Sequence, residues 1–175
     1  MPSRLLISAS LAALVALPGA ATAAPRGQNF DAHLTGAAER PDPRETPARG
    51  QANFALSADE ESIDYRLIAS NIENVVAAHI HCAADREREA GVAVTLYMDP
   101  NGAGSGRHDG VLATGEFSPS TECPVGDMTV LQAMRAGLAY VNVHTNDGTG
   151  DLNTGPGDFQ TGEIRGQIEA RGPSS

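Results

Sequence analysis

The sequence predicts an all-β protein, a Greek-key β-sandwich or flattened barrel of about eight strands with one short helix. Short stretches alternate between apolar and polar side chains, as strands with one buried face do. Clusters of Gly, Pro, Asn and Asp separate these stretches at short intervals. Many short strands joined by frequent turns are typical of sandwiches and barrels, so this class of fold is the expectation.

The first expected strand shows the pattern most simply. Phe30, Ala32 and Leu34 are apolar and alternate with the polar residues Asp31 and His33. Similar patterns predict strands over residues 52–56, 63–67, 75–81, 92–98, 111–117, 138–145 and 163–170. The stretches between some of these strands are rich in Pro, Gly or Asp and are expected to be loops, namely residues 36–49, 99–110 and 146–161.

The one expected helix covers residues 127–136. Met128, Leu131 and Met134 recur at helical spacing there, after Asp127 as a suitable N-cap and before Gly137 as a suitable stop. Methionines in such a pattern are typical of core packing. We therefore expect a short helix packed across one end of the β-structure.

The N-terminus is expected to be an export signal over residues 1–23. Arg4 precedes a largely apolar run over residues 5–17, and Ala21-Thr22-Ala23 then gives the small-x-small pattern that a signal peptidase recognises. The apolar run is too short to cross a bilayer. We expect a secreted or periplasmic protein with no membrane span after signal cleavage.

The remaining chain predicts one acidic domain over residues 28–170. About 150 residues suit a single hydrophobic core. The chain has 12 Lys and Arg residues against 22 Asp and Glu residues, which gives a net charge of −10. Because so acidic a chain repels phosphate backbones, nucleic acid is excluded as an expected partner.

The chain has two cysteines, Cys82 and Cys123. In a protein exported to an oxidising compartment, one disulfide between them is the default expectation. The alternative is a pair of thiolate metal ligands. It is less favoured because neither cysteine lies in a CxxC spacing.

Three short motifs carry the polar residues that could do chemistry: residues 78–81 (Ala-His-Ile-His), 140–145 (Tyr-Val-Asn-Val-His-Thr) and 162–167 (Gly-Glu-Ile-Arg-Gly-Gln). Each lies on an expected strand, so alternate residues share a face. Each strand then has one apolar face for the core and one polar face. If the strands are neighbours, their polar residues form one cluster of His79, His81, Asn142, His144, Glu163, Arg165 and Gln167.

These motifs, in this order, resemble the CHRD (chordin-type) domain family. The opening of the domain matches as well, with Phe30, Ala32, Leu34 and Gly36 at alternate positions. The resemblance covers about residues 30–168. Two segments depart from the family pattern: the charged segment 82–90 and the long link 146–161.

The resemblance implies an exported, non-catalytic binding or interaction module. Chordin, which gives the family its name, is an extracellular protein that sequesters growth factors. The implied partner of the present chain is an extracellular protein or glycan of unknown identity.

The alternative function is metal binding. His79 and His81, two residues apart on a strand, can face one ion, and His144 can complete a set of three imidazoles for copper or zinc. Glu163 is a candidate to orient one of them. The His-x-His strand also resembles the copper strand of copper/zinc superoxide dismutases, which would imply a dismutase-like redox activity.

A structural network competes with the metal site. In this interpretation His, Asn, Glu and Arg satisfy one another and define the strand register. Convergence of the imidazoles on one point would favour metal, whereas bonds to Asn142, Glu163 or the backbone would favour the network. Arg165 is expected to pair with a carboxylate. The Asp and Asn residues of the loop 146–161 suit calcium, although their spacing is not that of an EF-hand.

Overall fold

The computed structural model describes residues 28–102, 106–124 and 126–172, and this part of the chain is all-β. The predicted export signal lies outside the described residues. Within them, nine strands and one short α-helix confirm the predicted fold class, with one strand more than expected. The elements are β1 (Asn29–Thr35), the 3-10 turn η1 (Gly36–Ala38), β2 (Arg49–Leu56), β3 (Ile63–Glu73), β4 (Val75–Cys82), β5 (Val92–Met98), β6 (Arg107–Phe117), α1 (Val130–Arg135), β7 (Ala139–Thr145), β8 (Ile164–Gln167) and β9 (Glu169–Ala170).

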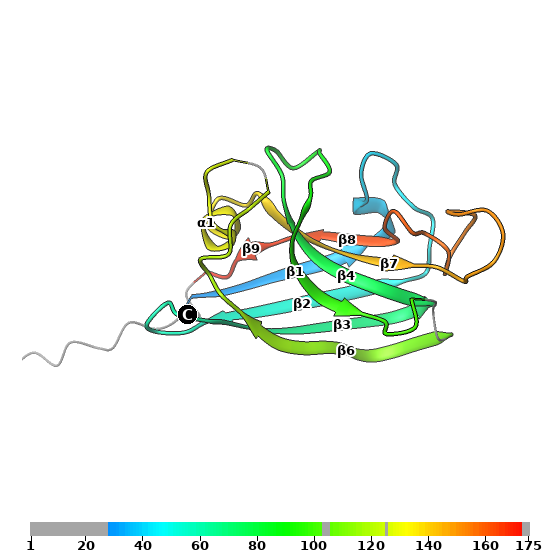
Figure 1. The fold of residues 1–175 in the computed structure, drawn as a ribbon, viewed down its shortest axis with the longest axis horizontal. Helices are drawn as coiled ribbons and strands as arrows, with labels where there is room; N and C mark the ends of the chain where they lie inside the picture. The colour runs from blue at the N-terminus through cyan, green and yellow to red at the C-terminus, as the bar shows by residue number, and fades with distance from the viewer. Residues whose placement is uncertain (1–27, 103–105, 125, 173–175) are drawn as a thin grey trace, which may run out of the picture.

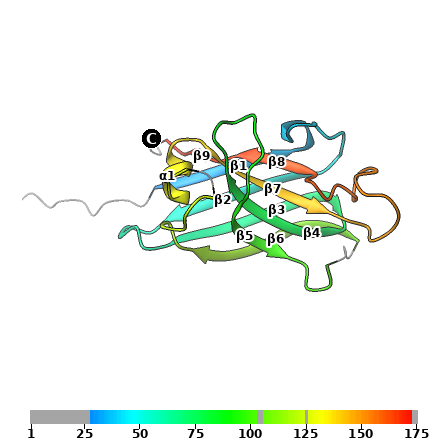
Figure 2. The same ribbon diagram turned by 45° about the horizontal axis from the view of Figure 1, so that its top comes forward.

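The strands form one antiparallel sheet that curls almost into a barrel (Figure 1). The strand order is β5-β4-β7-β8-β1-β2-β3-β6, and β9 pairs with β1. The two end strands, β5 and β6, lie side by side (Figure 2). The Tyr65 hydroxyl on β3 donates a hydrogen bond across this seam to the Leu96 carbonyl on β5, at 2.8 Å. The flattened barrel is therefore nearly closed.

The core lies inside the barrel and is built from the alternate apolar positions that predicted the strands. Side chains at these positions point inward because successive residues of a strand face opposite ways. The largest fully buried apolar side chains are Phe30, Leu34, Ile63, Leu67, Ile72, Ile80, Val130, Met134, Val141, Ile164 and Ile168.

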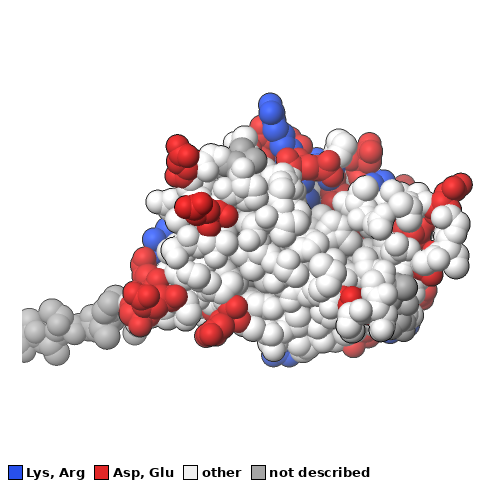
Figure 3. Space-filling model, viewed as in Figure 1, with Lys and Arg blue, Asp and Glu red and all other residues white. Residues whose placement is uncertain are grey.

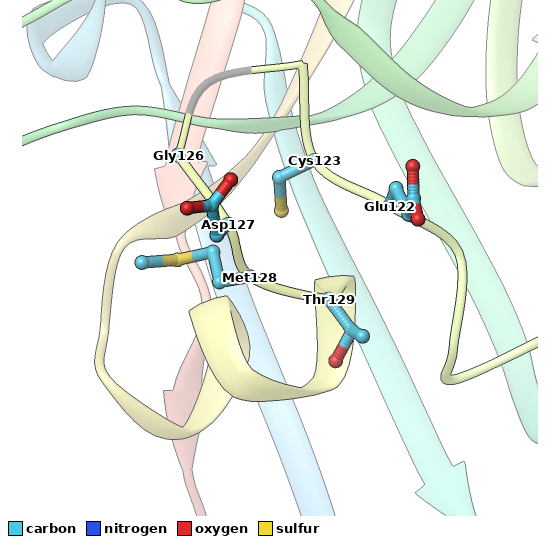
Figure 4. A pocket seen from close by; sticks show the side chains of 6 residues that line it. All are labelled: Glu122, Cys123, Gly126, Asp127, Met128 and Thr129. Atoms are coloured by element: carbon cyan, nitrogen blue, oxygen red, sulfur yellow. The ribbon is translucent and has the colours of Figure 1, made fainter.

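The helix begins later than predicted. The Thr129 hydroxyl accepts from the Gln132 backbone N–H, and the Gln132 side chain accepts from the Thr129 backbone N–H, which together form a capping box. Asp127 lies before this cap, so its prediction as the N-cap was wrong (Figure 4). Gly137 follows the last turn with φ of 65°, a left-handed conformation that Gly adopts readily, and ends the helix as expected.

Several predicted boundaries differ from the structure. β2 begins at Arg49 rather than at residue 52, and β3 continues to Glu73 rather than ending at residue 67. β6 begins at Arg107, so residues 107–110 are strand rather than loop. This extension pairs with the end of β3, and the backbone N–H of Asn71 donates to the Asp109 carboxylate at 2.7 Å. The predicted strand 163–170 is divided into β8 and β9 at Ile168.

The predicted disulfide is confirmed between Cys82, at the end of β4, and Cys123, in the loop before α1, with their Cα atoms 5.7 Å apart. A cavity of about 240 Å³ beside Cys123 is lined by Glu122, Cys123, Gly126, Asp127, Met128 and Thr129 (Figure 4). None of these six residues belongs to the three polar motifs. The described residues contain no helix long and apolar enough to cross a membrane.

Three loops cover the outer, polar face of β4, β7 and β8, namely residues 36–48, 83–91 and 146–163 (Figures 1 and 2). The first loop folds back on itself at Gly36, where a Cβ would collide with the Arg44 carbonyl oxygen. Because these loops bury the polar face, side chains that a bare sheet would expose to solvent have to find partners.

Candidate functional site

The three histidines lie together on the outer face of β4 and β7. The two strands are antiparallel neighbours, and their register places His79 opposite Asn142 and His81 opposite Tyr140. The imidazole centroids of His144 and His79 are 5.0 Å apart, those of His79 and His81 are 5.7 Å apart, and those of His81 and His144 are 6.3 Å apart. One ligand nitrogen from each ring lies within 4.8 Å of the other two. Within the described ranges, this is the only group of three or more His, Cys, Asp or Glu residues with such spacing.

Backbone carbonyls of the covering loops orient two of the rings. Nδ1 of His81 lies 2.8 Å from the Ala90 carbonyl oxygen, and Nδ1 of His144 lies 2.9 Å from that of Gln160. A carbonyl oxygen can only accept, so each Nδ1 carries the hydrogen. In the neutral ring the lone pair is then on Nε2 of both histidines.

Two ring nitrogens of the cluster are buried without a hydrogen-bond partner among the described residues. They are Nδ1 of His79 and Nε2 of His144. Nε2 of His81 lies 2.9 Å from Oδ1 of Asn142, and a hydrogen bond to the lone pair of the neutral ring requires the Asn142 amide to turn its NH2 group to this nitrogen. Buried polar atoms are normally satisfied, so these two nitrogens are available to a water molecule or to a metal ion.

The surroundings keep the cluster uncharged. Burial lowers the pKa of His79 to about 4, with a further contribution from the neighbouring imidazoles. Burial also lowers the pKa of His81 and of His144, and is in both cases the largest cause. The three imidazoles are therefore neutral near pH 7, the form in which a ring nitrogen can bind a metal ion.

Glu163 lies outside the histidine cluster, so it does not orient an imidazole. Its fully buried carboxyl group accepts hydrogen bonds from the Thr46 hydroxyl, from the Thr145 hydroxyl at 2.7 Å and from the Gly157 backbone N–H at 2.9 Å. It therefore ties two covering loops to the end of β7.

Arg165 forms no hydrogen bond with a carboxylate of the described residues, contrary to the expected ion pair. Its Nη2 donates to the carbonyls of Arg86 and Arg88, at 3.1 and 3.2 Å, and its guanidinium carbon lies 3.5 Å from the centroid of the Tyr140 ring. The same ring stacks on His81, with centroids 4.9 Å apart and planes 9° apart. Tyr140 thus connects Arg165 to the histidine cluster.

Gln167 and the acidic side chains of the loop 146–161 contribute nothing to the cluster. The Gln167 amide donates to the carbonyls of Gly137 and Ala139. In the loop, Oδ2 of Asp158 accepts from the backbone and hydroxyl of Thr154. The carboxylates of this loop do not form a group of three ligands among the described residues. The structure therefore gives no support to the calcium hypothesis.

Sequence reasoning did not assign a role to Glu39. It lies in the Pro-rich loop 36–48, a context that gives no sign of burial, yet it is only 3% exposed. Its Oε1 has no hydrogen-bond partner among the described residues. Burial raises the pKa of Glu39 to about 8, although the positive charges of Arg165 and Arg44 oppose this.

The raised pKa predicts that the contribution of Glu39 to the free energy of unfolding falls as the pH rises through neutrality. Between an unfolded-state pKa near 4.5 and a folded-state pKa of about 8, the folded protein keeps the Glu39 proton that the unfolded chain has lost. The contribution of Glu39 to the free energy of unfolding is therefore complete below the unfolded-state pKa near 4.5. It is lost as the pH rises through the folded-state pKa of about 8. From pH 6.5 to pH 8 the expected loss is about 1.5 kcal/mol.

Urea unfolding of the parent and of Glu39→Gln at pH 6.5 and pH 8 measures this loss as the difference between the two proteins, because the histidines, which are about half-protonated in the unfolded chain at pH 6.5, contribute equally to both. In Glu39→Gln, which cannot ionise at this position, the loss should disappear. Equal pH dependence in the two proteins would show that Glu39 does not hold its proton in the folded state.

The fold and the loop-covered polar face define an all-β barrel domain with a candidate ligand site on its outer surface. The family model of the CHRD domain matches residues 30–168, and the chain therefore belongs to the CHRD-domain family. No curated protein matches the chain. The family is consistent with a non-enzymatic binding module, and together with the disulfide it fits an extracellular protein. The family match does not test the resemblance of the His-x-His strand to the copper strand of superoxide dismutases.

Proposed function

We propose that the chain is an exported, non-catalytic binding module and that His79, His81 and His144 bind one Cu²⁺ or Zn²⁺ ion. The observation that carries this proposal is the convergence of three neutral imidazoles, with one nitrogen from each within 4.8 Å of the others. A purely structural network would leave fewer buried ring nitrogens without a partner.

The spacing of the rings suits a metal ion. With metal–nitrogen distances of about 2.0–2.1 Å, tetrahedral ligand nitrogens lie about 3.3 Å apart and their ring centroids about 5 Å apart. The observed centroids are 5.0 to 6.3 Å apart. Small side-chain rotations are therefore enough to bring the three nitrogens to one ion.

The partners of the rings fit both interpretations: contacts with Asn142 and with backbone carbonyls are those expected of the structural network, and the carbonyl contacts are also usual for metal-bound histidines. Metal-bound histidines usually donate their other N–H to a carbonyl or carboxylate, which defines the tautomer. The carbonyls of Ala90 and Gln160 take this role for His81 and His144. Oδ1 of Asn142 lies 2.9 Å from His81 Nε2, so binding of an ion at this nitrogen requires the amide to move aside.

The ligand set favours copper over zinc. Three imidazoles without a thiolate or carboxylate are suited to both ions, and a given site binds Cu²⁺ more tightly than Zn²⁺ in the general order of affinities. We assign the ion no catalytic role, in keeping with the non-enzymatic character of the family.

The macromolecular partner proposed for this module is an extracellular protein or glycan. Support comes from the face formed by β5 and β6, which carries few charged groups in a strongly acidic chain (Figure 3). The exposed apolar side chains on these strands are Val92, Met98 and Val111. A partner that covers these strands would remove the three apolar side chains from water, which favours binding.

Metal content tests the proposed ion site. The mature chain, prepared without a polyhistidine tag, is dialysed against Cu²⁺ or Zn²⁺ and its bound metal is counted. One equivalent is expected in the parent and none in His79→Ala. His33→Ala is the matched control, because the His33 side chain is 76% exposed on β1 and lies outside the cluster. This variant should keep the full equivalent.

Circular dichroism and thermal unfolding show whether each variant is folded. Since His79 makes no hydrogen bond to the described residues through Nδ1, its replacement by Ala should leave the metal-free fold intact. A parent that retains no metal would contradict the proposal, as would a folded His79→Ala that retains as much metal as the parent.

A further inference from the structure

We infer that a second site, lined by the arginines Arg40, Arg86 and Arg165, binds a small oxyanion of the carboxylate, phosphate or sulfate class. The site is a cavity of about 200 Å³ between η1, the loop 83–91 and β8, and its lining residues are Ala38, Arg40, Arg86, Glu87, Arg165 and Gln167. It is separate from the histidine cluster and does not depend on a metal ion there.

The central observation is the state of Arg165. This residue is 2% exposed, and no carboxylate of the described residues accepts a hydrogen bond from it. Nη2 donates to two backbone carbonyls, and no hydrogen bond joins Nε or Nη1 to the described residues, although neither nitrogen is among the fully buried atoms without a partner. A buried guanidinium normally has a charged partner, because an uncompensated charge in the interior is unfavourable.

The carboxyl groups close enough to affect Arg165 do not compensate it. Glu39 and Glu89 are the two that act on it. Glu39 is buried and keeps its proton at neutral pH, so it carries no charge. Glu89 is exposed in the loop 83–91, where solvent screens its charge.

The other two arginines are held by exchangeable partners. Arg40 pairs with Glu87 and Arg86 pairs with Glu169, each at 2.7 Å, and both acidic side chains are more than half exposed. Exposed ion pairs are weak, so an entering oxyanion can replace either carboxylate. Arg forms two parallel hydrogen bonds with carboxylate or phosphate oxygens, which suits this ligand class.

Arginines are concentrated at this cavity, although the chain as a whole is acidic. Three of its 12 basic residues line this one cavity, although acidic residues number 22. In Figure 3, basic atoms rise at the top of the molecule, where the loop 83–91 lies in Figure 1, beside acidic side chains. Because Arg40 and Arg86 are ion-paired, the cavity carries one uncompensated positive charge, that of Arg165, on an otherwise acidic surface.

Titration with oxyanions tests the site. Phosphate, sulfate and acetate are added separately to the ¹⁵N-labelled mature chain at an ionic strength held constant with chloride, and amide shifts are followed by NMR. Saturating shifts are expected at Arg86, Arg165 and Gln167. Saturation by phosphate and sulfate alone would assign a tetrahedral oxyanion, and saturation by all three would include carboxylates.

Two variants separate a built site from general charge attraction. Arg86→Gln should raise the dissociation constant about ten-fold, because it removes one charged contact at the exposed rim of the cavity. Arg135→Gln is the matched control, since Arg135 is also an exposed, ion-paired arginine but lies on α1. Shifts that do not saturate with any of the anions, or equal weakening in the two variants, would overturn the inference.

The metal proposal and the anion proposal can each be contradicted without affecting the other. His79→Ala removes an imidazole but leaves the three arginines in place, so its anion affinity should equal that of the parent. Loss of anion binding in a folded His79→Ala would overturn the assignment of a separate site. Absence of metal binding in the parent would not affect it.

Glu39 provides a second test through pH. It faces Arg165 on β8, Arg40 and Arg44 in its own loop, and Glu89 and Tyr140 from the neighbouring loop and strand. Once ionised at pH 9, Glu39 would compensate Arg165 and weaken anion binding about five-fold. Glu39→Gln should remove this weakening. A parent whose anion affinity is the same at pH 7 and pH 9 would contradict the role given to Arg165.

Discussion

Glu163→Ala is expected to lower the free energy of unfolding by about 4 kcal/mol. The Glu163 side chain is fully buried and accepts from the Thr46 hydroxyl, the Thr145 hydroxyl and the Gly157 backbone N–H. Alanine leaves these three donors without an acceptor, and each buried unsatisfied donor costs roughly 1–3 kcal/mol. Urea unfolding of the two proteins at one pH measures the difference.

Glu163→Gln is the matched control, because the amide keeps the shape of the side chain and one acceptor oxygen. We expect a loss smaller than that of the alanine variant. The carboxyl group does not touch the imidazoles, so the folded glutamine variant should bind metal as the parent does. A loss below about 1 kcal/mol in Glu163→Ala would show that the three bonds do not hold the loops.

The placement of the histidines on one face follows from strand periodicity alone. His79 and His81 alternate with Ile80, which is fully buried, so the two imidazoles had to lie on the outer face of β4. The same reasoning put His144 beside Asn142 on β7. Only the adjacency of β4 and β7 required information that a pattern within one strand does not contain.

The partners of the polar residues could not be predicted in this way. They come from loops whose sequences carry no periodic signal, and their positions depend on how each loop folds back over the sheet. Glu163 and Glu39 illustrate the difficulty. The first bonds to Thr46 rather than to a histidine, and the second is buried although it lies in a Pro-rich segment.

The late start of α1 has a local physical reason. Asp127 and Thr129 are both good N-cap residues, so composition does not decide between them. Thr129 has Gln132 three residues later, and this pair completes a capping box. A reciprocal pair of hydrogen bonds satisfies two backbone donors, whereas Asp127 alone would satisfy one.

Removal of the disulfide is expected to be as damaging as removal of the Glu163 carboxyl group. Cys82 and Cys123 are 41 residues apart, and in the chain-entropy model a loop of this length contributes about 4 kcal/mol. Both residues are buried, so the double variant Cys82→Ala/Cys123→Ala is preferable to one that places hydroxyls in the core. Urea unfolding should show the lower free energy of unfolding, and reduction of the parent should reproduce it.

Loss of the disulfide should leave the metal site largely unchanged, although Cys82 directly follows His81. β4 is paired with β5 on one side and with β7 on the other, so its position does not depend on the bridge alone. Cu²⁺ binding by the double variant, measured where it is fully folded, is therefore expected to match that of the parent. If the ion were lost while the fold remained, the bridge rather than strand pairing would hold His81 in place. If the double variant were as stable as the parent, the segment of chain between the two cysteines would already be constrained in the unfolded state without the bridge.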